Sequence, residues 1–301
     1  MDAALAISAL GAAANAEPAP DGRPWRDPRD AWQVVWSADT ESTQDDAAAC
    51  ARSCGQLGAR WLLVGSDHQR AGRGRQRSQW HGTQRALLVT LGCELDAPLQ
   101  RWPVASLIVG VTLADAIAAA TGADVRWKWP NDVLAMRDGR WCKVAGCLAE
   151  RHERPGYAAV WLLGFGVNID RVGLPTRVDA TSCGLDDLAP HRPIEQWLGD
   201  IVHAVRSSIE RWRNGGYVLD VAHAERRLAF IGDVIACDLG TEGVQRGRFL
   251  GLAGDGRLRI AADGGAERTW LPARIVGAAS TPPWQAAAPQ THTDAPDDAA
   301  P

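Results

Sequence analysis

Residues 125–150 read VRWKWPNDVLAMRDGRWCKVAGCLAE, and this stretch predicts three consecutive strands. Residues 125–129 have the pattern of a short strand, which the following proline ends. Residues 132–136 and 142–150 flank the dipeptide Asp138-Gly139, which is typical of a two-residue hairpin turn between β runs. Because helical patterns lie on both sides of this hairpin, the sequence indicates an α+β fold built on a mixed β-sheet.

The segments before and after this stretch continue the mixture of strands and helices. Further strands are predicted at residues 32–36, 60–66, 86–95 and 158–165. An Ala-rich helix is predicted at residues 104–120, and residues 194–209 have the apolar spacing of an amphipathic helix. Ser42 or Thr43 is expected to cap a further helix, because an acidic residue lies three positions after each of them.

Changes in composition divide the chain into four parts. Residues 1–31 and 278–301 are rich in Ala and Pro, and we expect both to be disordered tails. Short β runs separated by glycine turns fill residues 231–276, which predicts a small β-barrel. We therefore expect one main domain at residues 32–224 and a small β-barrel domain at residues 225–277.

The overall composition argues against several classes of protein. The net charge is −4, so no excess of positive charge indicates a nucleic-acid partner. We also expect no apolar run long enough to span a bilayer. The seven cysteines lack the spacing of a disulfide framework or a zinc site, which favours free thiols and a cytoplasmic location. Residues 14–16 resemble a signal-peptidase site, but no basic segment precedes them.

Two polar segments have the residue types of an anion-binding site. Residues 69–77 read QRAGRGRQR, in which glycines permit close backbone approach and arginines offer planar donors to phosphate or carboxylate. A solvated basic loop or an RNA-binding tract would have the same composition. Residues 128–132 read KWPND, and the Asn and Asp are hard oxygen ligands of the kind that suit a magnesium nucleotide. The same two residues are also common in ordinary turns.

Two strand segments carry polar residues at unusual places. Residues 142–150 read CKVAGCLAE, where a lysine among apolar residues either extends to solvent or faces an anion. The glycine within this segment leaves space for a ligand close to the strand. Residues 163–169 read LGFGVNI, in which a buried strand opens into glycines and an asparagine. Each segment alone is also explained by an edge-strand lysine or a simple strand end.

Taken together, in this order and spacing, the segments resemble the biotin protein ligase family. That family shows a Ser-Thr helix cap, an A-G-R-G-R loop, K-W-P-N-D, a K-x-A-G strand ending in Glu, and a G-x-G-x-N strand end. The resemblance covers about residues 32–277 and departs at Arg77 and Ser78, where the family usually has Gly and Arg. Some members carry an N-terminal helix-turn-helix domain, for which residues 1–31 are too few and too rich in Ala and Pro.

The resemblance implies a fold, an activity and a set of partners. The fold would be the class II synthetase-like catalytic domain of biotin and lipoate ligases, followed by a small SH3-like β-barrel. The activity would be the ATP-dependent formation of biotinyl-5′-adenylate and transfer of biotin to a lysine of a biotin carboxyl carrier protein. ATP and Mg²⁺ would be required. We expect no specific DNA binding, no membrane partner, and either a monomer or a homodimer.

The resemblance also implies roles for individual residues. Catalysis would involve Lys143, Arg73 and Arg75. Biotin would contact Ser42, Thr43, Gln44, Gln69, Arg73, Gly74, Arg75, Lys143 and Gly146. ATP would contact Arg73, Trp80, Lys128, Asn131, Asp132, Lys143 and Asn168, with Asp132 also binding Mg²⁺. In this assignment Lys143 pairs with the biotin carboxylate, Arg73 meets the ATP phosphates, and Trp80 packs on the adenine side.

Two other functions remain open at this level. A lipoate- or octanoate-type ligase shares the fold class and the adenylation chemistry, but its glycine-rich R-R-x-S-G-G-G segment is absent here. A non-enzymatic nucleic-acid-binding protein could be built on the Gly/Arg loop and the many tryptophans, although the net negative charge argues against it.

Overall fold

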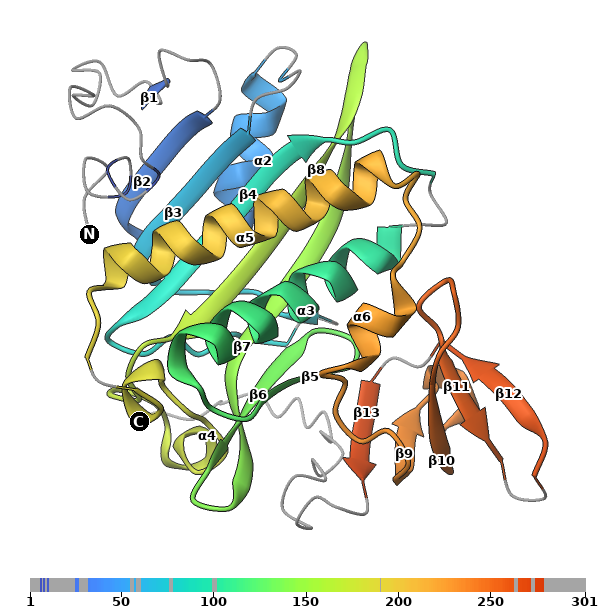
Figure 1. The fold of residues 1–301 in the computed structure, drawn as a ribbon. Coiled ribbons are helices and arrows are strands. Elements are labelled where there is room, and N and C mark those ends of the chain that lie inside the picture. The colour runs from blue at the N-terminus through green and yellow to red at the C-terminus, as the bar shows by residue number, and fades with distance from the viewer. Residues whose placement is uncertain are drawn as a thin grey trace, which may run out of the picture.

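The larger part of the molecule is an eight-stranded mixed sheet (Figure 1). A computed structural model describes residues 6, 8, 10, 25–26, 32–54, 57, 61–75, 78–98, 102–189, 191–262, 265–271 and 274–278. The strands are β1 (Trp25–Arg26), β2 (Trp32–Thr40), β3 (Trp61–Gln69), β4 (Ala86–Glu94), β5 (Val125–Lys128), β6 (Asp132–Arg137), β7 (Arg140–Arg154) and β8 (Tyr157–Asn168). Their spatial order is β1-β2-β3-β4-β8-β7-β6-β5, and all neighbours are antiparallel except β2 and β3. This confirms the mixed sheet that the sequence predicts.

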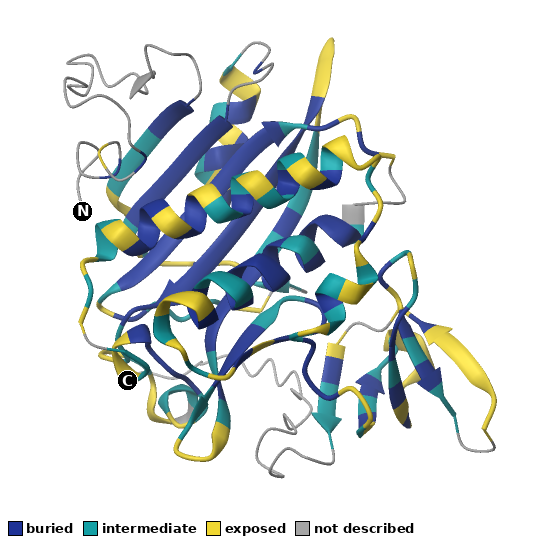
Figure 2. Cartoon of the chain, in the orientation of Figure 1, coloured by how far each residue is buried: buried dark blue, intermediate teal, exposed yellow. Residues whose placement is uncertain are grey.

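Helices cover the two faces of this sheet unequally. Helices α3 (Trp102–Thr121) and α5 (Ile194–Asn214) lie side by side across one face, where Leu63 belongs to the main core (Figures 1 and 2). The shorter α2 (Thr43–Ser53) packs with Leu62 in a separate small core. Because consecutive strand residues point to opposite faces, α2 lies on the other side of the sheet. That face is only partly covered by α2, and this leaves room for a site.

The predicted turn and cap both form. Arg137 pairs with Arg140 across the β6–β7 hairpin, and Asp138 and Gly139 have φ angles of 51° and 73°. Two consecutive positive φ values are those of the tight hairpin turn that Asp-Gly dipeptides favour. Ser42 is the N-cap of α2, and its hydroxyl accepts a hydrogen bond of 3.3 Å from the backbone N–H of Gln44. Both local features follow directly from the residue types.

Helix α3 corrects the prediction that no apolar run could span a bilayer. Residues 103–121 form a helical segment of 19 residues with a mean hydropathy of 1.9, which is sufficient by length and composition. In this fold 67% of that window is buried, because α3 packs against both the sheet and the neighbouring α5. A helix covered on several sides carries apolar residues around most of its circumference. The hydropathy of α3 is therefore that of a core helix.

The C-terminal part forms a second, five-stranded antiparallel sheet, in agreement with the small β domain that the sequence predicts. Its strands are β9 (Val234–Asp238), β10 (Val244–Leu252), β11 (Leu258–Ala261), β12 (Glu267–Trp270) and β13 (Arg274–Ala278), in the order β12-β11-β10-β9-β13. The short helix α6 (Val221–Glu225) precedes it. Trp129 joins the two parts, because its Nε1 donates to the carbonyl of Gly256 at 3.0 Å. Trp127 Nε1 donates to the carbonyl of Ala224 in α6 at 2.7 Å.

Ordered structure begins earlier than the sequence predicts. Strand β1 pairs with β2, with Trp25 opposite Val34, although it lies in the segment expected to be a disordered tail. Ala6 and Leu10 are buried in the main core as well. Apolar residues within an Ala-rich segment can therefore pack on the domain, which composition alone does not reveal. The tail predicted at 278–301 lies, except for Ala278 at the end of β13, outside the described residues.

Candidate active site

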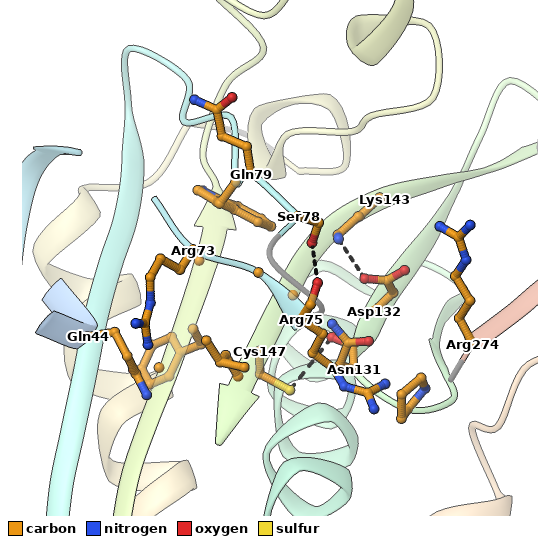
Figure 3. A pocket seen from close by; sticks show the side chains of 18 of the residues that line it. Gln44, Arg73, Arg75, Ser78, Gln79, Asn131, Asp132, Lys143, Cys147 and Arg274 are labelled. Carbon is orange, nitrogen blue, oxygen red and sulfur yellow. Dashed lines mark hydrogen bonds and ion pairs between the residues drawn. The ribbon is translucent and has the colours of Figure 1, made fainter. Parts of the chain in front are cut away.

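A cavity of about 340 Å³ opens on the face of the sheet that carries α2 (Figure 3). Its floor is formed by β7 and β8, and its walls by the start of α2, the 69–80 loop, the β5–β6 turn and the beginning of β13. The predicted site residues that line it are Ser42, Thr43, Gln44, Gln69, Arg73, Gly74, Arg75, Trp80, Lys128, Asn131, Asp132, Lys143 and Gly146. Segments that are far apart in the sequence thus meet in one concave site.

Asn168 is the predicted residue that the structure does not bring to this cavity. It is buried, and its side-chain nitrogen lies 3.4 Å from the carbonyl oxygen of Cys183. Asn168 lies on the same face of β8 as Gly164 and Gly166, which do line the cavity. The segment around Cys183 covers this end of the strand, so Asn168 belongs to its packing.

One end of the cavity is cationic. Arg75, Lys128, Lys143 and Arg274 line it, and among the described lining residues Asp132 is the single carboxylate. Lys143 Nζ lies 2.5 Å from Asp132 Oδ1. Burial raises the pKa of Asp132, but the charges of Lys143 and Lys128 outweigh this and hold the pKa below its ordinary value. Asp132 is therefore ionised at neutral pH.

Two of these cations are held in surroundings that disfavour their charge. Burial lowers the pKa of Lys128, although Asp132 opposes the shift. Burial also lowers the pKa of Arg75, whose guanidinium lies 5.9 Å from the ring centroid of Trp129. Cations brought together in a partly desolvated cavity attract an anion strongly, because each cation interacts favourably with the negative charge of the anion. The arrangement therefore suits a phosphate-bearing ligand.

The opposite end of the cavity is polar and uncharged. Gln69 Oε1 accepts hydrogen bonds from the backbone N–H of Thr43 at 2.8 Å and from its hydroxyl at 3.1 Å. The hydroxyl oxygens of Thr43 and Thr90 lie 3.0 Å apart, and Thr90 donates to Gln44 Oε1 at 3.1 Å. Sequence analysis missed Thr90, although a lone threonine in the apolar run of β4 was a local signal.

The 69–80 loop is folded back on itself. Gly74 N–H donates to the carbonyl of Ser78 at 2.7 Å, and the carbonyl of Arg75 accepts from both the N–H and the hydroxyl of Ser78, at 3.0 and 2.8 Å. Ser78, one of the two positions that depart from the family pattern, thus closes a turn within the loop. Arg77, the other, lies outside the described residues.

Arg73 forms ion pairs with two carboxylates. One of its terminal nitrogens lies 2.6 Å from both carboxylate oxygens of Glu150, and the other lies 2.9 Å from Asp45. The expectation that Arg73 meets ATP phosphates stays a prediction. Two carboxylates on α2 and β7 satisfy the guanidinium, and sequence spacing gave no indication that they would converge.

Trp80 lies flat on the floor of the cavity. A Cβ atom added at Gly166 would come within 2.5 Å of the Trp80 ring, and one at Gly146 within 3.1 Å. The two glycines therefore make room for the indole. Lys143 Nζ lies 5.2 Å from the ring centroid, in a cation–π contact. The structure thus places Trp80 against the strands next to Lys143, and the expected contact with adenine is untested.

Several lining residues had no sequence signal. Arg274, Ile275 and Val276 come from β13 in the C-terminal sheet, and only the tertiary structure brings them to the cavity. Cys147 lies on the floor, and burial raises the pKa of its thiol to about 12, so it is not a nucleophile at neutral pH.

Comparisons with known proteins agree with this geometry. Residues 37–168 match the sequence profile of the Biotin/lipoate A/B protein ligase family. The biotin--[acetyl-CoA-carboxylase] ligase of Mycobacterium tuberculosis is 33% identical over 224 residues, which cover 72% of this chain and 77% of that protein. The bifunctional ligase/repressor BirA of Bacillus subtilis is 26% identical over 218 residues, covering 69% and 64%. The biotin protein ligase from Aquifex aeolicus in complex with biotin and ATP superposes with a TM-score of 0.65 at 20% identity, covering 80% of this chain and 97% of that chain.

Proposed function

The chain belongs to the biotin/lipoate A/B protein ligase family and is a biotin–protein ligase, and we propose that both steps of the reaction take place in the cavity described above. The observation that carries this proposal is the division of the cavity. A neutral end with amide and hydroxyl groups adjoins an end with four cationic side chains. Biotin has a ureido ring at one end and a carboxylate at the other. It would therefore lie with its ring at the neutral end and its carboxylate at the cationic end.

In the first step the biotin carboxylate attacks the α-phosphorus of ATP. A carboxylate–phosphorus bond forms, the bond to the bridging oxygen of the β-phosphate breaks, and pyrophosphate leaves. The protein supplies no nucleophile, so its contribution is orientation and stabilisation of negative charge. Lys143 is the cation nearest to Asp132 and Trp80, and we assign it to the carboxylate and then to the adenylate phosphate. Arg75, Lys128 and Arg274 would stabilise the remaining phosphate oxygens.

In this cavity the protein would supply only a few of the ligands of Mg²⁺. Asp132 and Asn131 offer hard oxygen donors at the cationic end, and no group of three or more His, Cys, Asp or Glu capable of holding a metal lies among the described residues. Mg²⁺ commonly binds through one or two carboxylates together with substrate phosphates. Asp132 would therefore hold the ion, whose charge would offset that of the phosphates.

In the second step the amine of an acceptor lysine attacks the carbonyl carbon of biotinyl-adenylate. A carbon–nitrogen bond forms, the bond to the phosphate oxygen breaks, and AMP leaves with its charge neutralised by the same cations. We propose that the acceptor is the biotin carboxyl carrier domain of a carboxylase, and that the reaction takes place in the cytoplasm.

The decisive experiment is ATP–pyrophosphate exchange with the purified full-length chain. Exchange should require biotin and magnesium, and lipoate or octanoate should not replace biotin. Exchange supported by lipoate and not by biotin would assign the chain to the lipoate branch of the family. Transfer is then tested by mass spectrometry of an isolated carrier domain, which should gain one biotin on a single lysine.

A further inference from the structure

We propose that Glu150 is a positioning residue that fixes the hydrogen-bond polarity of the neutral end of the cavity. This inference rests on the proposed function and deepens it, because it explains why a cyclic urea fits there. Glu150 lies on β7 behind the lining residues and reaches the cavity through the side chain of Gln44. Its effect on the ligand would be transmitted through a chain of hydrogen bonds.

The first link fixes the orientation of the Gln44 amide. Gln44 Nε2 lies 3.1 Å from Glu150 Oε2 and 3.3 Å from the carbonyl oxygen of Leu162. A carboxylate and a carbonyl both accept hydrogen bonds and cannot donate. The NH₂ group of Gln44 must therefore point toward Glu150, and its oxygen must point toward Thr90.

The remaining links carry this orientation to the ligand end. Since Gln44 Oε1 only accepts, the hydroxyl hydrogen of Thr90 points to it, and Thr90 can offer only lone pairs to Thr43. Thr43 then uses its own hydrogen for Thr90 or for Gln69 Oε1, both of which are acceptors. The Thr43 oxygen is left to accept from a ligand N–H. Gln69 Oε1 is occupied by Thr43, and among the described residues no partner for Gln69 Nε2 is found, so that NH₂ group can donate to a ligand carbonyl.

The resulting pattern is one acceptor beside one donor. A cyclic urea presents N–H groups on both sides of a carbonyl and matches this pattern. The dithiolane ring of lipoate has neither group and would leave both protein partners unsatisfied, which is costly in a desolvated site. The same polarity would therefore determine the specificity for the ring.

Arg73 forms an ion pair with Glu150, whose carboxylate is the first member of this series of hydrogen bonds. Its guanidinium contacts both oxygens of Glu150 at 2.6 Å, and Asp45 contacts the same guanidinium from α2. Charge-assisted pairs of this kind are directional as well as strong. The ion pair thus fixes the carboxylate against Gln44 and links the 69–80 loop to the biotin ring end.

The test is Glu150→Gln, with Asp45→Asn as a matched control. A glutamine at position 150 keeps the shape but can donate or accept, so Gln44 is free to turn over. We expect the KM for biotin in pyrophosphate exchange to rise about tenfold, as for the loss of one charge-assisted hydrogen bond, while kcat stays within about threefold. Asp45→Asn removes the other partner of Arg73 without touching Gln44, and it should change the KM by less than about twofold.

A second pair of variants tests the same series of hydrogen bonds and does not depend on whether Glu150→Gln folds. Thr90→Val removes the hydroxyl and should raise the KM, whereas the conservative Thr90→Ser keeps the hydroxyl and should raise the KM much less. The double variant Glu150→Gln/Thr90→Val should be no worse than Thr90→Val alone, because both changes interrupt one chain. An unchanged KM in Thr90→Val, an unchanged KM in a folded Glu150→Gln, or additive effects in the double variant would overturn the proposal. Wild type without biotin-dependent exchange would instead refute the proposed function.

A second inference follows from the basic residues, which comprise 30 arginines and two lysines. Both lysines, Lys128 and Lys143, line the cavity. Biotinyl-adenylate acylates amines: the lysine nitrogen bonds to the carbonyl carbon and AMP leaves. We infer that the chain resists acylation by its own intermediate, since it has no side-chain amine outside the cavity.

This inference is tested with synthetic biotinyl-adenylate and peptide mapping of side-chain amines. Arg246 and Arg268 are exposed on β10 and β12, and Arg246→Lys and Arg268→Lys add one amine each at unchanged charge. Wild type should remain unlabelled outside the cavity, and each variant should be labelled at its new lysine. Biotin on another side chain of wild type, or unlabelled variants beside a labelled bystander protein, would overturn the inference.

Discussion

Lys143→Ala should abolish adenylate formation while leaving the protein folded. The lysine nitrogen lies 2.5 Å from Asp132 Oδ1, and the two side chains are 36% and 25% exposed. Breaking a fully buried pair costs about 3–5 kcal/mol, and an exposed pair contributes about 0–1 kcal/mol. A pair of intermediate burial should contribute about 1–2 kcal/mol, particularly since Lys128 remains to stabilise Asp132.

The expected loss of activity is larger than this loss of stability. A preorganised donor to developing negative charge contributes about 100- to 1,000-fold in kcat. A destabilisation of 1–2 kcal/mol lowers the Tm by roughly 2–8 °C in a chain of this size. We would measure pyrophosphate exchange and thermal unfolding on the same preparations. Lys143→Arg keeps the charge but should recover little activity, because Gly146 leaves limited space: a Cβ atom added there would lie 3.1 Å from Lys143 Cε.

Two results would refute this reasoning. Exchange within about threefold of wild type would remove Lys143 from the chemistry. Loss of activity together with loss of the folding transition would show that the lysine acts through stability. Arg140→Ala is a suitable control, because Arg140 lies on the same strand and is exposed outside the cavity.

The remaining predictions concern the loop, the carboxylate and DNA. Arg75→Gly removes a cation from the cavity and adds flexibility to the 69–80 loop, so biotinyl-adenylate should escape and a lysine-rich bystander protein should be labelled more than with wild type; equal labelling, with adenylate formed by both, would argue against retention by Arg75. Because the pKa of Asp132 is below its unfolded value, its contribution to stability is present above about pH 4 and is lost as the pH falls through the folded pKa. Urea unfolding should therefore show wild type losing more stability than Asp132→Asn on acidification, and parallel pH profiles would contradict this. The chain should bind no specific DNA sequence; a gel shift that survives about 0.15 M salt and requires one sequence would disprove this.

Local chemistry explains why so much of the fold was predictable. Asp138-Gly139 forms the hairpin turn because its backbone tolerates positive φ, and Ser42 caps α2 because its hydroxyl accepts from the first turn. The Lys-Trp-Pro-Asn-Asp and Gly/Arg segments predicted an anion site for the same reason, since glycine, lysine and arginine have recognisable roles near phosphates. Such signals depend on a few neighbouring residues.

The sequence did not reveal features that depend on residues far apart in the chain. The apolar length of α3 was overlooked in the sequence, and the packing of α3 against the sheet and α5 identifies it as a core helix. No sequence signal indicated that Arg73 would pair with Glu150, which lies 77 positions away. Asn168 fits a motif but is covered by the segment around Cys183.

The sequence by itself thus determined the family, the mixed sheet, the small β domain and the segments that supply the site. The tertiary structure alone decided which side chains meet: Arg274 reaches the cavity from β13, Thr90 joins Thr43 to Gln44, and Glu150 pairs with Arg73. The physical reason is that turns, caps and strands are set by interactions within a few residues. The polarity of a binding site depends on contacts between strands and helices whose register and packing are fixed only when the whole core is assembled.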